Sequence, residues 1–85
     1  MDRYLIETPH EMQECSQLFD QFRVMGYLYN FDWGCKAGVH SGWAIIEAES
    51  EKQAQMVVPA IVRGKARVIK LSRFDPVEDK ALHGH

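Results

Sequence analysis

The same helix-start signal occurs at three points of this sequence, in residues 8–11, 50–53 and 75–78. In the first, a Thr suited to the N-cap is followed by Pro at the first helical position and Glu at the third. In the second, Ser50 is followed three residues later by Gln53. Short extended runs separate these signals, so the chain is constrained to alternate between strands and helices.

The expected elements follow from where the side-chain period changes. Residues 27–35 have the clearest period-two alternation in the chain, with aromatic residues at every second position until Cys35. The sequence predicts strands at residues 3–7, 27–35, 39–49 and 66–72, and a turn at residues 36–38. It predicts helical segments from residue 8 to Gly26 and from Ser50 to Gly64, the second of which Pro59 should kink or end.

The order β-α-β-β-α-β predicts the α+β class and a ferredoxin-like fold. Right-handed crossovers put the first and third strands at the centre of a four-stranded antiparallel sheet, with both helices on one face. We expect a single domain over residues 1–85, in which residues 75–85 form a C-terminal helix and tail.

The helix-free face of this sheet is the least settled part of the prediction. Large residues such as Trp43 and Ile45 alternate with small ones, and Ile69 and Leu71 share a face of the last strand. A solvated face would be more polar, so we expect a second copy to cover it and form a dimeric α+β barrel. The alternative is a monomer whose C-terminal helix folds over the face.

Composition excludes several kinds of partner. The net charge is −2 and there is no extended basic run, which argues against nucleic-acid binding. No apolar run reaches the roughly 18 residues needed to span a membrane, and the first ten residues show no signal-peptide core. With two cysteines and no disulfide framework, we expect a cytoplasmic protein with reduced thiols.

The sequence "FDWGCKAGVHSGWAIIEAESEKQA", followed by "VVP" and "KARVIKL", resembles a group of small uncharacterised microbial proteins related to the dimeric α+β-barrel superfamily. The resemblance covers nearly the whole chain and implies the same fold. The wider superfamily includes isomerase-like and cofactor-free monooxygenase-like enzymes, ligand-binding regulators and stress proteins. None of their catalytic motifs is matched residue by residue, so the resemblance implies no activity.

The residues able to carry chemistry are predicted to share one edge of the sheet, where the first strand ends and the hairpin turns. We expect His10, Cys35, His40, Arg63 and Lys65 along this edge. His40 and His10 are the candidate acid–base residues. The candidate ligand-binding residues are Trp33, Cys35, His40 and Trp43.

Each of these residues also has a structural interpretation. Cys15 falls on the apolar stripe of the first helix and is expected in the core, and Cys35 continues an apolar face. His10 is expected to be an exposed first-turn residue. His10, Cys35 and His40 are chemically suited to zinc, but short ligand spacings such as CxxC or HxxxH are absent. We therefore expect no metal site and no cofactor.

The function that the sequence favours is a small homodimer that binds a small molecule or serves an interaction role without catalysis. One alternative is a cofactor-free isomerase or monooxygenase-like enzyme with a histidine acid–base. A second is a metal-binding protein that uses histidine and cysteine. The sequence leaves open whether the chain is an enzyme at all.

Overall fold

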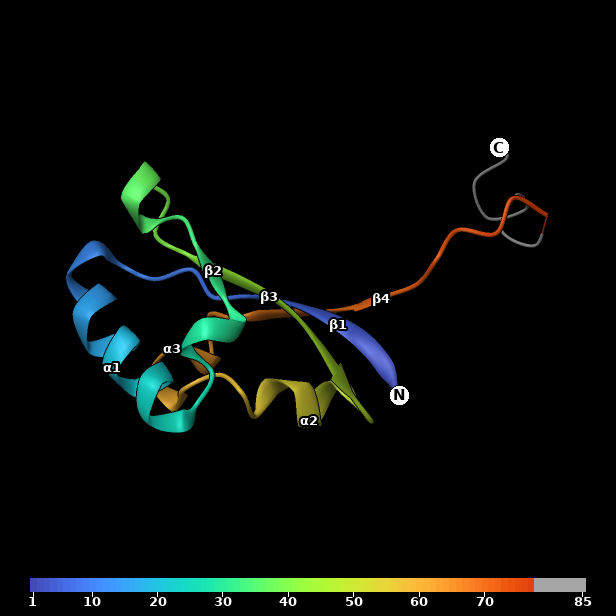
Figure 1. Cartoon of the computed structure of the whole chain (residues 1–85), viewed down its shortest axis with the longest axis horizontal. Coiled ribbons are helices and arrows are strands. Elements are labelled where there is room, and N and C mark those ends of the chain that lie inside the picture. Colours follow the sequence, from blue (N-terminus) through green and yellow to red (C-terminus); the bar gives the residue numbers. More distant parts are fainter. Residues whose placement is uncertain (78–85) are drawn as a thin grey trace.

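The computed structural model describes residues 1–77 of the chain. It has an α+β fold in which three helices lie on one side of a four-stranded sheet (Figure 1). The strands are β1 (Asp2–Glu7), β2 (Asp32–Trp33), β3 (Gly42–Ala48) and β4 (Arg67–Leu71), the α-helices are α1 (Cys15–Met25), α2 (Glu51–Gln55) and α3 (Ala60–Arg63), and the 3₁₀ turns are η1 (Met12–Glu14), η2 (Leu28–Asn30) and η3 (Cys35–Ala37).

The sheet is antiparallel throughout, with strand order β2-β3-β1-β4. The sequence correctly predicts that the first and third strands are central. In the register of the sheet, Leu5 of β1 lies between Ile45 of β3 and Ile69 of β4. A single strand alternates its side chains between two faces, so these three residues share the face without helices.

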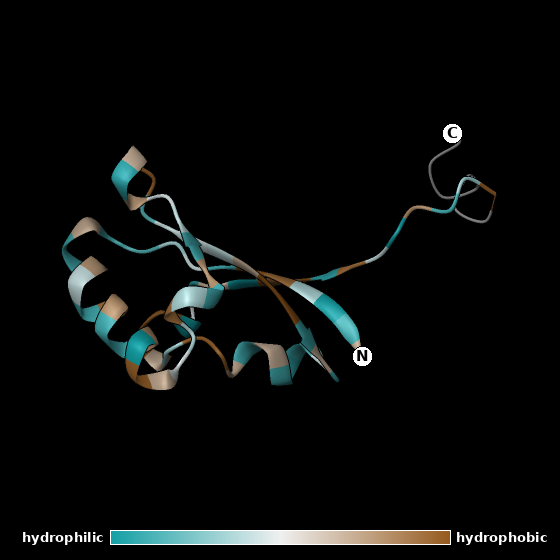
Figure 2. Cartoon of the chain, viewed as in Figure 1, coloured by the Kyte–Doolittle hydropathy of each residue, from teal (hydrophilic) through white to brown (hydrophobic). Residues whose placement is uncertain are grey.

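The core lies between the sheet and the helices. Side chains from β1 alternate into it, and α1 adds Leu18 and Phe22, spaced one helical turn apart. The largest fully buried side chains are Phe22, Ile6, Leu18, Val58, Val62 and Thr8. Hydrophobic colouring follows the middle of the sheet and the α2–α3 connection, whereas α2 itself is largely hydrophilic (Figure 2).

The first helix begins later than the sequence predicts. Thr8 is not a helix cap: its hydroxyl is fully buried and bonds to the backbone of Gly42. The helical segment starts instead at Glu11, whose capping box with Glu14 opens η1. Residues 8–10 therefore remain extended, and this shift positions the candidate site.

The prediction of a long strand over residues 27–35 is wrong. Only Asp32–Trp33 is paired with β3, and 3₁₀ turns occupy Leu28–Asn30 and Cys35–Ala37. Phe31 and Trp33 of this segment pack as a cluster against α1, with the Phe31 ring 4.7 Å from that of Phe22, whereas Tyr29 is 94% exposed. The same alternation of apolar residues can arise when aromatic side chains pack against a helix, without the backbone hydrogen bonds of a paired strand.

The predicted second helical segment is broken at Pro59: α2 already stops at Gln55, and α3 begins directly after the proline, which occupies its N-cap position. Ser50 caps α2 by accepting a hydrogen bond from the Gln53 amide. After Leu71 the chain runs away from the body of the fold (Figure 1). The predicted C-terminal helix and tail at 75–85 lie mostly outside the described residues, so the structure does not test them.

The helix-free face carries an apolar row made by Ile45, Leu5 and Ile69, and Ile45 is 57% exposed. Charged residues flank the row on both sides. Arg3 and Glu47 are neighbours on one side, and the Glu7 carboxylate lies 3.5 Å from the Arg67 guanidinium on the other. In the described part of the chain, no helix is both long and apolar enough to cross a membrane.

Candidate metal centre

The candidate site begins where the β1–β3 pairing continues beyond the end of β1. The Thr8 amide donates to the Gly42 carbonyl at 2.9 Å, and the His10 amide donates to the His40 carbonyl at 3.0 Å. This places His10 opposite His40 in an extended pair. Antiparallel neighbours bring their side chains within contact distance, so the two histidines meet although 30 positions separate them in the sequence.

Two helical starts supply the cysteines. Cys15 is the first residue of α1, and Cys35 is the first residue of η3. The hairpin turns back at Gly38, which has a φ of 85° that favours glycine. The Gly34 amide donates to the Ser41 carbonyl at 3.0 Å, which closes this loop and keeps Cys35 beside His40.

The four side chains converge on one point. Their ligating atoms all lie within 4.8 Å of one another. The Cys15 Sγ lies 3.2 Å from His10 Nε2, 3.3 Å from His40 Nδ1 and 3.7 Å from Cys35 Sγ, and the Cys35 Sγ lies 3.4 Å from His10 Nε2. The cluster thus contains two imidazoles and two thiols.

Hydrogen bonding alone does not account for this convergence. The Cys15 sulfur is within bonding distance of three partners, but a thiol has a single hydrogen and is a weak donor. A cation at the common centre would satisfy all four ligand atoms together.

Four of the six separations between the ligand atoms are close to those of a tetrahedral zinc site. With Zn–S near 2.3 Å and Zn–N near 2.0–2.1 Å, tetrahedral angles separate two sulfurs by about 3.8 Å and a sulfur from a nitrogen by about 3.6 Å. The sulfur–sulfur contact is 3.7 Å and three sulfur–nitrogen contacts are 3.2–3.4 Å, within a few tenths of an ångström of these values. The remaining separations extend up to 4.8 Å, so the side chains would have to close by about 1–1.5 Å there to enclose the ion.

His10 is oriented for this role by its second ring nitrogen. Its Nδ1 lies 3.0 Å from the Thr8 carbonyl, which only accepts, so Nδ1 carries the proton. The lone pair is then on Nε2, the atom that faces both sulfurs. Histidine ligands of metals commonly donate their other N–H to a backbone carbonyl in this way.

The electrostatic environment of Cys35 favours the thiol until a cation binds. Burial, followed by the neighbouring Cys15, raises the pKa of Cys35, while backbone amides of Ser41 and Cys35 itself oppose the rise. Nearby, the backbone amide of Glu11 and then Lys65 hold the pKa of Glu14 below its ordinary value. The thiolates would therefore form when a metal ion displaces their protons.

Access to the cluster is uneven. His10 is 8% exposed, whereas Cys15, Cys35 and His40 are partly exposed. Cys35 also lines a groove of about 570 Å³ whose walls are mainly aromatic, formed by Phe19, Leu28, Tyr29, Phe31, Asp32, Trp33 and Lys36. Cys35 therefore borders an open groove.

The other residues expected at the site are divided between two faces. Trp33 lies beside the cluster, with its ring centroid 6.2 Å from that of His10, and its indole occupies the space above Gly42. Trp43 lies on the other face, where its indole N–H donates to Glu7. Trp33, Cys35 and His40 are thus close together, and Trp43 is separate from them.

The two basic residues predicted for this edge also differ in position. Lys65 reaches Glu14 at 3.0 Å, next to Cys15. The Arg63 guanidinium bonds instead to the Val58 carbonyl at 2.8 Å, so it belongs to the α2–α3 turn. The expectation that His10 is an exposed first-turn residue is wrong, because its ring is buried.

Cys15 is the residue that the sequence interpretation missed. It is not a core residue, being partly exposed with its sulfur in the cluster. A signal was available in the spacing: His10 and Cys15 are five apart, as are Cys35 and His40. This mirrored H-x₄-C and C-x₄-H arrangement is longer than the zinc-ligand spacings commonly sought.

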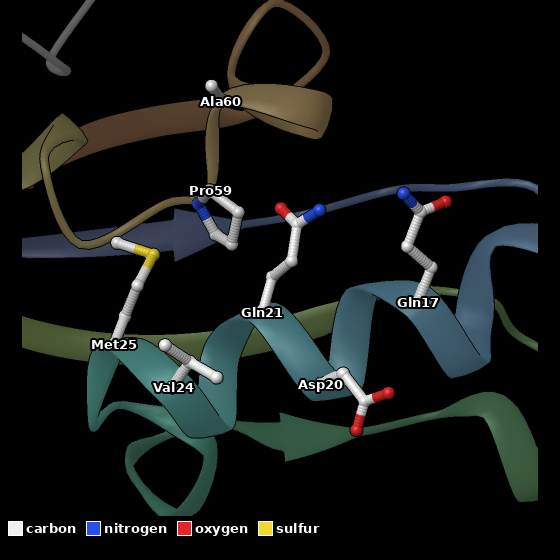
Figure 3. Close-up of a pocket in the computed structure, with 7 residues that line it drawn as sticks. All are labelled: Gln17, Asp20, Gln21, Val24, Met25, Pro59 and Ala60. Atoms are coloured by element: carbon white, nitrogen blue, oxygen red, sulfur yellow. The ribbon is translucent and has the colours of Figure 1, made fainter.

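A second groove, between α1 and the start of α3, offers less chemistry (Figure 3). It has a volume of about 310 Å³ and is lined by Gln17, Asp20, Gln21, Val24, Met25, Pro59 and Ala60. The Gln21 amide extends toward Pro59, while the Asp20 carboxylate points away from it. No histidine or cysteine is among these lining residues, so the cluster is the stronger candidate site.

No protein-family model, curated protein or solved structure matches this chain. The candidate function therefore depends on the geometry of the site.

Proposed function

We propose that this chain is a small, non-catalytic metal-binding protein that holds one zinc ion with His10, Cys15, Cys35 and His40. The observation that carries the proposal is the convergence of two imidazoles and two thiols within 4.8 Å. Borderline-soft zinc prefers this nitrogen and sulfur set, and two thiolates would neutralise its charge.

The ligand number favours a structural rather than a catalytic ion. Catalytic zinc sites keep a position open for water or substrate, whereas structural sites are closed by four protein ligands. Here four side chains from three separate segments would fill the coordination sphere. The ion would thus join the end of β1, the start of α1 and the hairpin, and it would supplement the modest core of an 85-residue chain.

The proposal is tested by native mass spectrometry and by metal titration of reduced protein purified without a metal-affinity tag. We expect one zinc ion per chain, and Co²⁺ in its place should give the strong visible bands of a tetrahedral thiolate complex. Cys15→Ala should abolish both results. Ser41→Ala is the matched control, because Ser41 adjoins His40 and its buried hydroxyl has no hydrogen-bond partner within the described residues. Zinc-free wild type under saturating zinc would overturn the proposal.

The second part of the proposal concerns the helix-free face, which we propose pairs with a second copy. The strand order β2-β3-β1-β4 supports the ferredoxin-like assignment, and the exposed row of Ile45, Leu5 and Ile69 supports the face-to-face dimer.

The charges beside the row are arranged to complement themselves. In a dimer whose two sheets face each other, let the two-fold axis run between the sheets, parallel to the row of Ile45, Leu5 and Ile69. Residues on one side of this row in one copy then face residues on the opposite side of the row in the other copy. Arg3 meets Glu7 of the partner subunit, and each aliphatic residue of the row meets its own copy. Face-to-face sheets with nearly aligned strands are a common packing.

Ile45→Lys is the sharpest test of this interface, measured as solution mass by light scattering. We expect a wild-type dimer and a monomeric variant, since the substitution puts two like charges at the centre of the contact. Val24→Lys is the control, because Val24 is 77% exposed on α1 and lies off this face. A monomeric wild type would rule out the dimer, and a dimeric Ile45→Lys would move the interface elsewhere.

A further inference from the structure

The chain has two cysteines, and both lie in the His/Cys cluster. Their sulfurs are free and 3.7 Å apart. No third thiol competes within the chain, so oxidation of one sulfur has a single internal partner. The pair also supplies every thiolate of the proposed zinc site, and any bond between the two sulfurs removes half of the ligands in one step.

Both cysteines are partly exposed, but of the two only Cys35 borders the aromatic groove. Cys35 lines the aromatic groove together with Trp33 and Lys36, whereas Cys15 is not among the residues that line it. An oxidant that enters the groove therefore meets Cys35. The Cys15 sulfur lies 3.7 Å from the Cys35 sulfur and within contact distance of both histidines.

We propose that the site is a thiol redox switch, in which a hydroperoxide converts the zinc-bound thiolates of Cys15 and Cys35 into a disulfide and the zinc ion is released. This inference rests on the proposed zinc binding and names its regulation. Hydrogen peroxide is the simplest oxidant of the required class.

The reaction balances as a two-electron oxidation. The Cys35 thiolate attacks one peroxide oxygen and becomes a sulfenic acid, and the other oxygen leaves as hydroxide. The Cys15 thiolate then attacks the Cys35 sulfur, forms the S–S bond and displaces the second hydroxide. Two protons from solvent convert both hydroxides to water. Zinc leaves as Zn²⁺ with its oxidation state unchanged.

The disulfide form retains only His10 and His40 as ligands. Two imidazoles without thiolates hold zinc far more weakly than the full set. The ion then no longer joins the end of β1 to the hairpin, although the disulfide still links α1 to η3. A thiol reductant restores both thiolates by exchange, so the switch is reversible.

The test treats zinc-loaded, reduced protein with hydrogen peroxide and follows released zinc with a chromophoric chelator. We expect close to one equivalent of zinc per chain, and rebinding after dithiothreitol. The covalent product is read separately by alkylation and trypsin digestion, because four methionines also gain oxygen from peroxide. Cleavage after Arg23 separates the cysteines, so the disulfide joins peptide 4–23 to peptide 24–36.

Cys15→His is the matched control. It keeps four potential zinc ligands but has no second thiol, so under the same treatment it should give no joined peptides. If Cys15→His folds poorly, Cys35→His provides the reciprocal control. Metal-free reduced wild type should also give the joined peptides, which tests the sulfur pair without zinc.

The possible failures are distinct. If reduced wild type takes up no zinc, the proposed function fails. If it binds zinc but peroxide releases none, or releases it without joining the two peptides, the redox switch alone is wrong.

Discussion

The core beneath the sheet and the His/Cys cluster at the end of β1 are built from different kinds of residue and different kinds of backbone. The core takes side chains such as Ile6 and Phe22 from regular strands and helices, and these are fully buried. The cluster takes four polar side chains from segment ends and turns, and three of the four are partly exposed. Apolar packing needs no partner, whereas under the proposed function the cluster is completed by a cation at its centre.

The difference should separate the two regions in stability measurements. A variant in the core should lower the free energy of unfolding by the same amount with and without zinc. A variant in the cluster should lower it mainly when zinc is present.

Phe22→Ala should destabilise the fold by about 3–5 kcal/mol, because it removes a fully buried ring and leaves a cavity. The Phe22 ring also contacts those of Phe31 and Trp33. Urea unfolding monitored by circular dichroism measures the change. Equal losses in zinc-free and zinc-loaded protein are expected, and a loss confined to the loaded protein would contradict the separation of core and cluster.

His40→Ala should remove most of the stabilisation that zinc supplies. For wild type, free zinc at 100 times its dissociation constant should raise the free energy of unfolding by about 2.7 kcal/mol. The variant should gain far less at the same zinc concentration. In zinc-free protein its loss should be small, because His40 is partly exposed. Thermal unfolding at fixed zinc concentrations compares the two proteins, and an unchanged zinc response would remove His40 from the site.

Acid should weaken zinc binding steeply. Between the ordinary pKa values of histidine and cysteine, near 6.5 and 8.5, zinc must displace a proton from each thiol. Affinity should then fall by about 100-fold for each pH unit lowered. Because burial and Cys15 raise the pKa of Cys35, its proton must still be displaced at a pH where an ordinary thiol is ionised.

Competition titrations across this pH range measure the slope. Cys35→His supplies a control with one thiol fewer, so its affinity should change by only about tenfold per pH unit. A wild-type slope as shallow as that of the control would mean that one thiolate, rather than two, binds the ion.

The sequence predicts the fold better than the site, and the reason is visible in particular residues. Leu18 and Phe22 are one helical turn apart, and the β1 residues alternate, so local periodicity identifies the core directly. The central placement of β1 and β3 follows from the order of elements. The aromatic alternation of residues 27–35 misleads, because Tyr29 and Phe31 belong to turns and a packed cluster rather than to a long strand.

The candidate site depends on pairing between segments far apart in the chain. The sequence places His10, Cys35 and His40 near one edge, and the structure brings them together. The sequence does not reveal Cys15 as a site residue, because a cysteine at helical spacing has the same pattern as a core residue. It also cannot show that the extended pairing continues through His10, since the Thr8-Pro9 sequence is equally typical of a helix start.

Gly42→Ala should test how closely the hairpin is packed against the cluster. A β-carbon at this position would lie 2.5 Å from a carbon of the Trp33 ring, so the indole must shift beside His10. We expect a loss of about 1–3 kcal/mol and weaker zinc binding. Gly64→Ala is the control, because no heavy atom lies within 4 Å of the added carbon and its φ of −69° suits alanine. Equal effects at the two glycines would contradict the close packing.

Ser50→Ala should have the smallest effect and should be independent of zinc. The Ser50 hydroxyl accepts a hydrogen bond from the Gln53 amide at the start of α2, which lies well apart from the first turn of α1 (Figure 1). Loss of such a cap typically costs about 1 kcal/mol. The exposed Ser72, which follows β4, provides a control in Ser72→Ala with little expected change. If Ser50→Ala also lowered zinc affinity, the helix-covered core and the cluster would be energetically coupled, and the two regions would have to be treated as one cooperative unit.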